Sequence, residues 1–250
     1  MNSLENYVEQ ITLSKNPQEA FDKYCSIVKA FGYDRAVYSL ITDHPSLSLP
    51  RQHGLITDYP ETWMKHYVEN NYIDEDPVIL RISKSQTPFF WSDLEKLDTI
   101  SNTSQKLMLE AEEEGIADGV GISLQGCPGE VVGVGLARTG NSNDNAKDYE
   151  MLSSAYFITV FFHETYRSMM GMPLRTELSK REQEVLLWAA EGKTDEEVGI
   201  ILGISQNTIR FHWKNIFKKL DAYGRVYAVT KAIRLNLITP YIINTPYQKR

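Results

Sequence analysis

Apolar side chains recur along the first two thirds of the chain with the spacings of both helices and strands. Asn16 and Pro17 are typical of a helix start, and aromatic residues follow at helical spacing until Gly32 ends the pattern. The segment 35–41 is rich in β-branched and aromatic residues, which predicts a strand. The same reasoning predicts helices at 60–70, from 76 onward, at 104–114 and at 146–169, and strands at 89–91, 119–124 and 131–137.

These elements predict an α+β domain built on an antiparallel sheet. The strands 119–124 and 131–137 are joined by a turn that contains Gly and Pro, as in a hairpin. Strands and helices do not alternate regularly, so a parallel doubly wound sheet is not expected. The apolar positions of the long helix 146–169 include Leu152, Ala155, Phe157, Val160, Phe161 and Tyr166.

The last third of the chain shows four shorter helical patterns. The first two begin with capping boxes, in which Ser179 pairs with Glu182 and Thr194 pairs with Glu197. Gly192 ends the first of these helices. A tight turn at Gly203-Ile204 and two further helices at 205–220 and 225–237 complete the prediction.

The helix predicted at 205–220 has one apolar and one polar face. The apolar face comprises Ile209, Trp213, Ile216, Phe217 and Leu220, and the polar face carries Gln206, Asn207, Arg210, Lys214, Asn215 and Lys218. Taken alone, the polar face is explained equally well by an ordinary solvated surface. The preceding short helix and tight turn favour a helix-turn-helix, whose second helix enters the major groove of DNA.

In that geometry, Arg210 and Lys214 lie four residues apart on one stripe, and we predict that they contact base edges. The side chains on either side of this stripe are better placed for phosphates, and Thr208 suits either kind of contact. The other predicted DNA-binding residues are Thr194, Gln206, Asn207, Thr208 and Lys218.

Charge is distributed unevenly, which changes the meaning of the net charge of −7. Residues 171–250 contain 13 Lys and Arg against 8 Asp and Glu, whereas residues 1–170 contain 13 against 25. The basic part can face phosphates, while the acidic part would be repelled by them. The chain is therefore expected to hold two domains with different partners.

The C-terminal part resembles the LuxR-type four-helix DNA-binding domain over about 65 residues. The motifs that carry the resemblance are LSKREQEVL at 178–186, EGKT at 191–194, ISQNTIRFH at 204–212 and Lys219-Leu220. Glu182, Leu186 and Gly192 match three near-invariant positions of that family. The resemblance implies a DNA-binding transcription regulator.

The N-terminal half contains a set of aromatic side chains and one carboxylate. Trp63 and Tyr67 are four residues apart and therefore share a helix face. Asp76 precedes Pro77, and Trp91 follows a further helix. Core packing or helix capping explains each of these residues singly. Together they are typical of an aromatic-walled pocket for a mostly apolar ligand with an amide.

This set resembles the N-acyl-homoserine-lactone (autoinducer) receptors of the LuxR family, and the resemblance runs over essentially the whole chain. The family pattern is matched at Trp63, Tyr67, Asp76-Pro77, Trp91 and Gly119. The resemblance implies that Trp63 binds the lactone carbonyl and that Asp76 binds the amide N–H. It also implies that Tyr59 binds the acyl-amide carbonyl, and that Tyr67 and Trp91 pack on the acyl chain and the lactone ring.

Two positions depart from that family. Ser123 stands about where many relatives have a proline, and Gly135 stands where a hydroxyl residue often lines the pocket. The contact to any 3-oxo group is therefore left open, and the missing side chain at Gly135 is expected to widen the cavity. Ser39 and Ser123 are two alternative sources of a hydroxyl.

The resemblance implies an α-β-α sandwich around a five-stranded antiparallel sheet, followed by an all-α helix-turn-helix domain. We predict a sensor domain at 1–168, a linker at 169–176 and a DNA-binding domain at 177–250. Family members act as homodimers on palindromic promoter sites, usually recruiting RNA polymerase and sometimes repressing. We expect a cytoplasmic protein without membrane contact, because no apolar run is long enough to span a bilayer.

We expect no cofactor, metal or catalytic site. The two cysteines and five histidines show no metal-ligand spacing. An enzyme would need a nucleophile with its base or a phosphate-binding loop, and neither is found in the sequence. A response regulator would need a parallel receiver domain, which the N-terminal pattern does not supply. A LuxR-type regulator of a different small molecule stays open as an alternative.

Overall fold

The structure, a computed structural model, describes residues 3–41, 54–96, 101–125, 131–139, 147–170, 177–235 and 237–239. These residues form two compact units, one ending at Met170 and the other starting at Glu177. Met169, predicted as linker, still belongs to the last helix of the first unit. Met170, also predicted as linker, caps that helix. Residues 171–176 of the predicted linker lie outside the described residues, so the domain boundaries stay predictions.

The first unit combines helices with one sheet. Its helices are α1 (Leu4–Thr12), α2 (Pro17–Ala30), α3 (Glu61–Glu69), α4 (Pro77–Ile82), α5 (Asn102–Glu113) and α6 (Tyr149–Met169), with the 3-10 helices η2 (Tyr72–Asp74) and η3 (Trp91–Lys96). Its strands are β1 (Arg35–Leu40), β2 (Leu55–Thr57), β3 (Phe89–Phe90), β4 (Asp118–Gln125) and β5 (Val131–Arg138). Neighbouring strands are antiparallel, in the order β2-β1-β5-β4-β3.

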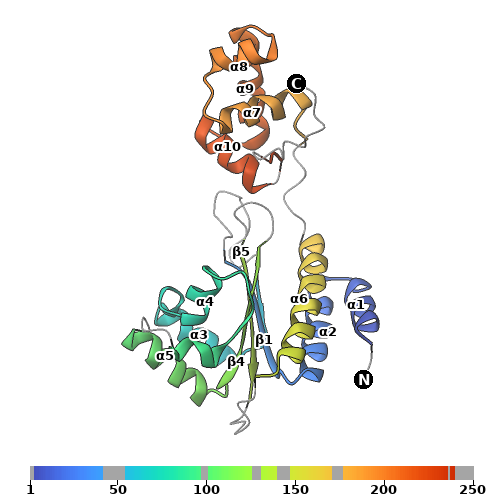
Figure 1. Cartoon of the computed structure of the whole chain (residues 1–250), viewed down its shortest axis with the longest axis vertical. Coiled ribbons are helices and arrows are strands. Elements are labelled where there is room, and N and C mark those ends of the chain that lie inside the picture. Colours follow the sequence, from blue (N-terminus) through green and yellow to red (C-terminus); the bar gives the residue numbers. More distant parts are fainter. Residues whose placement is uncertain are drawn as a thin grey trace. The chain divides into compact units, whose positions relative to one another are not determined.

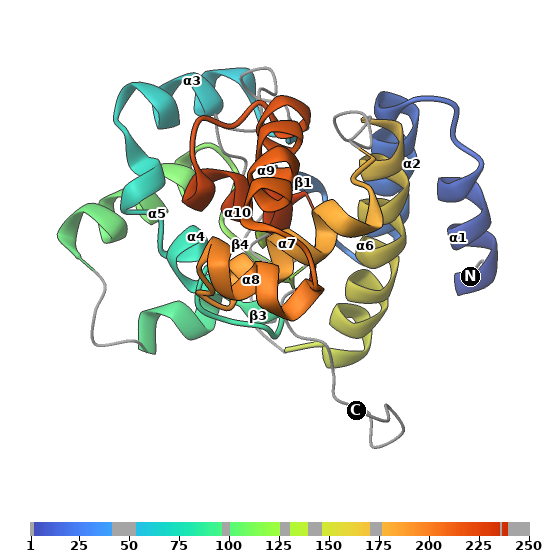
Figure 2. The same cartoon turned by 90° about the horizontal axis from the view of Figure 1, so that it is seen from above.

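Helices cover both faces of this sheet. In Figure 1, α1, α2 and α6 lie on one side of the strands, and α3, α4 and α5 lie on the other. Figure 2, seen from above, shows the same separation. Each side has its own cluster of buried apolar residues. The predicted α-β-α sandwich around a five-stranded antiparallel sheet is therefore confirmed.

The two faces of the sheet carry side chains of very different size. Ile122 and Val134 point toward the α2 and α6 side, where they are fully buried. Because side chains alternate along a strand, the neighbouring positions point toward α3, α4 and α5. Those positions on β4 and β5 are mostly small, namely Gly119, Gly121, Ser123, Gly133, Gly135 and Ala137. This glycine face leaves space between the sheet and its helices.

Several elements differ from the sequence prediction. Helix α1 and the short strand β2 were not predicted, and α6 begins at Tyr149 rather than near 146. Two of the apolar positions noted in α6, Phe157 and Val160, are 43% and 36% exposed. Ile158 and Phe162 are fully buried instead. This helix is apolar on more than one side, so spacing alone does not identify the buried stripe.

The second unit contains α7 (Lys180–Ala190), α8 (Asp195–Leu202), α9 (Gln206–Leu220) and α10 (Arg225–Arg234), which confirms the predicted helix-turn-helix domain. Both capping boxes are present, at Ser179 and at Thr194. Gly203 has a φ of 67°, in the left-handed region that glycine adopts readily, so the chain can turn sharply between α8 and α9. In the parts of the chain that the structure describes, no helix is long and apolar enough to cross a bilayer.

Candidate ligand pocket and DNA-binding face

A cavity of about 80 Å³ lies between the glycine face of the sheet and the helices α3, α4 and α5. Its wall includes five of the residues predicted from the sequence: Tyr59, Trp63, Tyr67, Asp76 and Trp91. Sequence reasoning did not predict the apolar part of the wall, which includes Val37, Ile79, Ile82, Leu107, Met108 and Ile116. The cavity has room for several groups of the size of a water molecule.

Two glycines of β5 open this cavity. A Cβ atom at Gly133 would lie 2.7 Å from the Ile41 Cδ1, which is closer than such atoms pack. A Cβ atom at Gly135 would lie 3.0 Å from the Val37 Cγ1 and 3.3 Å from the Tyr59 hydroxyl oxygen. Both glycines line the cavity. The small residue at position 135 therefore does widen the pocket, as the sequence suggested.

Two predicted site residues shape the cavity without lining it. A Cβ atom at Gly119 would lie 2.2 Å from the Leu136 carbonyl oxygen and 3.0 Å from the Trp91 ring, so only glycine fits beneath that indole. Pro77 is buried at the first position of α4, where its ring suits the start of a helix. It fixes the turn that carries Asp76.

The Asp76 carboxylate combines a capping role with a position on the cavity wall. Its Oδ1 accepts hydrogen bonds from the backbone N–H groups of Val78, at 2.8 Å, and Ile79, at 3.3 Å. Its Oδ2 accepts one from the Tyr67 hydroxyl at 2.8 Å. Burial raises the pKa of Asp76 above its ordinary value, although these hydrogen bonds act in the opposite direction. Asp76 therefore caps α4, as its position before Pro77 suggested. Its Oδ2 atom can still accept a second hydrogen bond beside the one from Tyr67.

Tyr59 and Trp91 bring unsatisfied donors to the pocket. The Tyr59 hydroxyl oxygen and the Trp91 indole nitrogen are both buried without a hydrogen-bond partner among the described residues. Burial also raises the pKa of Tyr59, so its hydroxyl stays protonated and able to donate. Unpaired buried donors of this kind destabilise a protein and call for an explanation at each site.

The two serines considered as hydroxyl sources have different places. Ser123 is 1% exposed, and its hydroxyl donates to the Ile82 carbonyl oxygen at 3.1 Å. That bond joins β4 to the end of α4, and Ser123 does not belong to the cavity wall. Ser39 on β1 does line the cavity. It is therefore the serine that can present a hydroxyl to a ligand.

A polar cluster around Glu110 holds α5 to α3 and η2 on the outer side of the cavity. The Glu110 Oε2 accepts a hydrogen bond from the Tyr72 hydroxyl at 2.6 Å and lies 2.9 Å from the His66 Nε2. Lys106 adds an ion pair to the same carboxylate at 3.4 Å. The hydrogen bonds from Tyr72 and His66 lower the pKa of Glu110 to about 2. The carboxylate is therefore ionised at neutral pH.

In the second unit, α9 presents most of the predicted DNA-binding side chains to solvent. The exposed residues of this face are Gln206, Asn207, Arg210, Lys214 and Lys218. Phe211 lies among them and is 59% exposed, although it was not selected from the sequence. A large exposed aromatic beside Arg210 adds an apolar group to the face, of the kind that can contact a thymine methyl.

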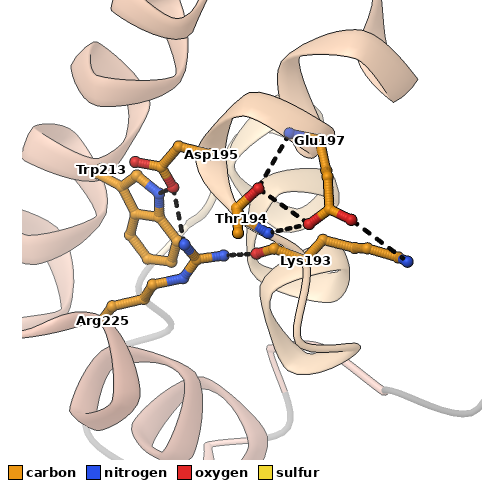
Figure 3. A network of polar contacts seen from close by, with 6 residues as sticks. All are labelled: Lys193, Thr194, Asp195, Glu197, Trp213 and Arg225. Carbon is orange, nitrogen blue, oxygen red and sulfur yellow. Dashed lines mark hydrogen bonds and ion pairs between the residues drawn. The ribbon is translucent and has the colours of Figure 1, made fainter.

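The two predicted threonines are occupied with helix capping. The Thr194 hydroxyl caps α8 by accepting from the Glu197 N–H at 3.3 Å, and Glu197 in turn binds the Thr194 backbone N–H at 2.7 Å (Figure 3). Thr208, half-buried near the start of α9, shares a 2.9 Å hydrogen bond with the Ser205 hydroxyl. Both are thus held rigidly at helix starts, where backbone N–H groups also favour phosphate.

Figure 3 also shows how α8, α9 and α10 are tied together. The Asp195 Oδ1 accepts from the Trp213 indole N–H and from Arg225, each at 2.9 Å. Arg225 donates as well to the Lys193 carbonyl oxygen. The side of α9 opposite its basic face is therefore fixed to the rest of the second unit by hydrogen bonds and by packing.

Comparison with known families assigns both units. Residues 16–166 match the family described as autoinducer binding domain, and residues 176–232 match the family described as bacterial regulatory proteins, luxR family. The chain belongs to the LuxR family. It is a transcription regulator with an autoinducer-binding domain and a helix-turn-helix domain, not an enzyme.

Relatives of this LuxR-family chain span almost its full length. The regulatory protein SdiA of Escherichia coli is 31% identical over 209 residues, which cover 80% of this chain and 83% of SdiA. The transcriptional activator protein LuxR of Aliivibrio fischeri is 27% identical over 260 residues, which cover 98% of each chain. A crystal structure of E. coli SdiA has the same fold, with a TM-score of 0.74 at 24% identity over 94% of this chain and 97% of that one.

The near-invariant LuxR positions have structural roles in this chain. Glu182 is 3% exposed, and its Oε2 accepts from the Ser179 N–H and from Lys219, both at 2.7 Å. Leu186 is fully buried in the core of the second unit. Gly192 has a φ of 78°, which ends α7 at little cost. The resemblance at these positions therefore reflects how the domain folds.

Proposed function

We propose that this LuxR-family regulator is a quorum-sensing receptor that binds an N-acyl-homoserine lactone in the first unit and controls transcription through the second. The observation that supports the ligand best is the mostly apolar cavity with the Asp76 carboxylate on its wall. A partly desolvated carboxylate gains from a donor such as an amide N–H. An acyl amide supplies this donor together with an apolar tail for the remaining wall.

In this proposal each polar wall residue takes one group of the ligand. Trp63 donates to the lactone carbonyl, Asp76 accepts from the amide N–H, and Tyr59 donates to the acyl-amide carbonyl. Tyr67 and Trp91 pack on the acyl chain and the lactone ring. The lactone then fills the sensor core and stabilises the folded first unit by mass action, because it binds the folded state and not the unfolded one.

The second unit is proposed to place α9 in the major groove of promoter DNA. Arg210 and Lys214 read base edges, with roughly 1–3 kcal/mol of discrimination for each good contact. The other residues of the face contact the backbone and fix the register: Thr194, Gln206, Asn207, Thr208 and Lys218. Because its proposed partner is DNA, the protein is proposed to act in the cytoplasm. It is proposed to activate transcription if it recruits RNA polymerase to the promoter.

The regulator is proposed to act as a homodimer on a palindromic site. Two recognition helices then lie about one helical turn of DNA apart. Helix α10 and the turn before it offer a surface for this contact, since Val226 of the helix is 81% exposed and Tyr223 of the turn is 90% exposed. The Tyr223 and Tyr227 rings stack with centroids 4.6 Å apart. A Val226→Asp variant is expected to remain monomeric in sedimentation experiments and to lose affinity for the palindrome.

The ligand assignment is tested by producing the whole chain with and without a panel of acyl-homoserine lactones. We expect a lactone to co-purify, to be identified by mass spectrometry and to raise both soluble yield and promoter affinity. If no member of the panel changes either quantity, the lactone assignment is wrong. Octanoyl-rac-glycerol, which is bound in a solved structure of SdiA, is a useful comparison ligand. Binding of this compound alone would favour a receptor for a different small molecule.

The DNA assignment is tested with Arg210→Ala against a matched control. Lys180→Ala removes the same charge from the exposed start of α7. We expect the Arg210 variant to bind the cognate promoter roughly tenfold more weakly and to discriminate less at one base pair. The Lys180 variant is expected to stay close to the wild type. Equal losses from both variants would contradict base reading by α9.

A further inference from the structure

Phe211 of α9 leaves most of its side chain open to solvent, with 59% of it exposed. The buried residues of the same helix form one stripe: Ile209, Trp213, Ile216 and Leu220. Successive residues of an α-helix are turned by about 100°, so Phe211 points almost directly away from this stripe. Arg210 points to one side of it. Phe211 therefore lies closer to the centre of the outward face of α9 than Arg210 does.

Packing within the second unit does not explain this aromatic side chain. Among the described residues, its ring contacts that of His212, the next residue in the chain, with centroids 5.9 Å apart. A contact between successive residues joins no two elements. Phe211 also lies outside the apolar core to which Leu186 and Trp213 belong. The ring therefore contributes little to holding the helices of this unit together.

The surroundings of Phe211 on α9 are polar and positively charged. Neighbours on a helix surface lie three or four positions apart, and for Phe211 these include Asn207, Lys214 and Asn215. The helix contains four Lys and Arg residues and no Asp or Glu. Such a face complements the charge of DNA phosphates. Phe211 is thus an apolar side chain at the centre of a face that is electrostatically complementary to DNA.

The base edges in the major groove offer one apolar group, the 5-methyl group of thymine. The Phe211 ring neither donates nor accepts an ordinary hydrogen bond. Against a polar base edge or a phosphate it would displace water without replacing the hydrogen bonds of that water. A thymine methyl group loses no hydrogen bond when it contacts the ring, and both apolar surfaces leave water. Of the groups in the groove, this methyl group therefore suits Phe211 best.

We propose that Phe211 contacts the 5-methyl group of a thymine in the binding site and makes the regulator prefer thymine at that position. Hydrogen bonds from Arg210 and Lys214 distinguish donors from acceptors on the base edges. The contact from Phe211 recognises a group that forms no hydrogen bond. This inference rests on the proposed function, because it assumes that α9 enters the major groove.

The experiment uses a DNA site that the whole wild-type protein selects from random duplexes. Each thymine of this site is replaced in turn by deoxyuridine, which keeps every hydrogen-bonding group and lacks only the methyl group. At one thymine position we expect the replacement to raise the dissociation constant of the wild type about fourfold, the loss that corresponds to one buried methyl-sized group. In Phe211→Ala the same replacement is expected to change the dissociation constant by a factor of about one.

Because each ratio compares two DNAs with one protein variant, a general loss of folding or affinity cancels. Lys218→Ala is the matched control, since it removes another exposed side chain from the same face. It is expected to weaken binding to both DNAs alike and to keep the wild-type ratio. If no deoxyuridine weakens binding by the wild type, or if the effect survives Phe211→Ala, this inference alone is overturned. If the selection yields no specific site, the proposed DNA-binding function fails as well.

Discussion

Trp213 donates its indole N–H to the Asp195 carboxylate over 2.9 Å, and this bond joins α9 to α8. Arg225 of α10 donates to the same oxygen, and its guanidinium carbon lies 5.2 Å from the centre of the Trp213 ring. Trp213 is only 5% exposed, so its N–H is poorly solvated once Asp195 is lost. One carboxylate therefore holds three helices of the DNA-binding unit in register.

Asp195→Ala is expected to destabilise the second unit by about 1–3 kcal/mol, because it leaves the buried Trp213 N–H without an acceptor and removes one of the two acceptors of Arg225. Scanning calorimetry of the whole chain measures the effect, and promoter binding should weaken in parallel. Glu196→Ala is the control, since it removes an exposed carboxylate from the same first turn of α8. A control that proved as damaging as Asp195→Ala would show that helix-dipole charge, rather than the Trp213 bond, dominates.

Asp76→Asn is expected to separate ligand affinity from stability. Burial raises the pKa of Asp76, so the folded protein binds a proton more readily than the unfolded chain. The free energy of unfolding without ligand therefore decreases as pH rises from the ordinary pKa through the raised pKa. Asn caps helices as well as Asp does, and it carries no charge to desolvate. We expect the variant to be more stable than the wild type at neutral pH when no ligand is present.

The same Asp76→Asn variant should bind its lactone about tenfold to a hundredfold more weakly, because a charged acceptor for the amide N–H is lost. Calorimetric titration gives the affinity, and denaturant unfolding at several pH values gives the stability. A variant with unchanged affinity would show that Asp76 serves only as the cap of α4.

Local sequence signals predicted much of the fold. The capping boxes at Ser179 and Thr194 and the tight turn at Gly203 depend on neighbours within a few residues, and all three were confirmed. The buried stripe of α6 depends on which elements pack against it. Phe157 and Ile158 are equally apolar in sequence, yet one is 43% exposed and the other is fully buried.

The pocket was predicted only where a family pattern marked it. Trp63 and Asp76 stood out by their type and spacing, whereas Leu107 and Met108 look like ordinary positions of an amphipathic helix. Their place on the wall follows from the packing of α5 across the glycine face, which joins segments distant in the sequence. The unpaired Trp91 N–H likewise becomes evident only when its surroundings are known.

The buried Glu182 carboxylate predicts a pH-dependent contribution to the stability of the second unit. Burial alone would raise the pKa of Glu182, but the hydrogen bonds from Lys219 and Ser179 outweigh burial and lower it. The stabilisation is thus present above the ordinary pKa of a Glu side chain and is lost as pH falls through the lowered value. Glu182→Gln should cost about 1–2 kcal/mol at pH 7, and the difference should shrink in acid.

Glu184→Gln is the matched control for Glu182 because it lies on the same helix and pairs with exposed Arg181 at 2.8 Å. Exposed ion pairs of this kind contribute little, so we expect a change below about 0.5 kcal/mol. Urea unfolding at pH 7 and in acid well below the ordinary pKa of a Glu side chain compares the two variants. A Glu182 effect that stayed constant over this range would contradict an ionic origin.

The Glu110 cluster should control how fast a bound ligand leaves. Helix α3 supplies Trp63 and Tyr67 to the cavity wall, and α5 supplies Leu107 and Met108, so parting of these helices opens the pocket. In the described part of the chain, the Glu110 carboxylate joins α5 to both Tyr72 and His66. Glu110→Gln is therefore expected to speed ligand dissociation.

Glu113→Gln removes an exposed acid from the same helix and should leave the dissociation rate unchanged. Stopped-flow release of a fluorescent lactone measures both variants. The pKa of Glu110 is lowered to about 2, so its hydrogen bonds persist throughout the neutral and mildly acidic range. The difference between wild type and Glu110→Gln should accordingly stay constant from pH 8 to pH 5. A difference that disappeared within this range would contradict a restraint by the ionised Glu110 carboxylate.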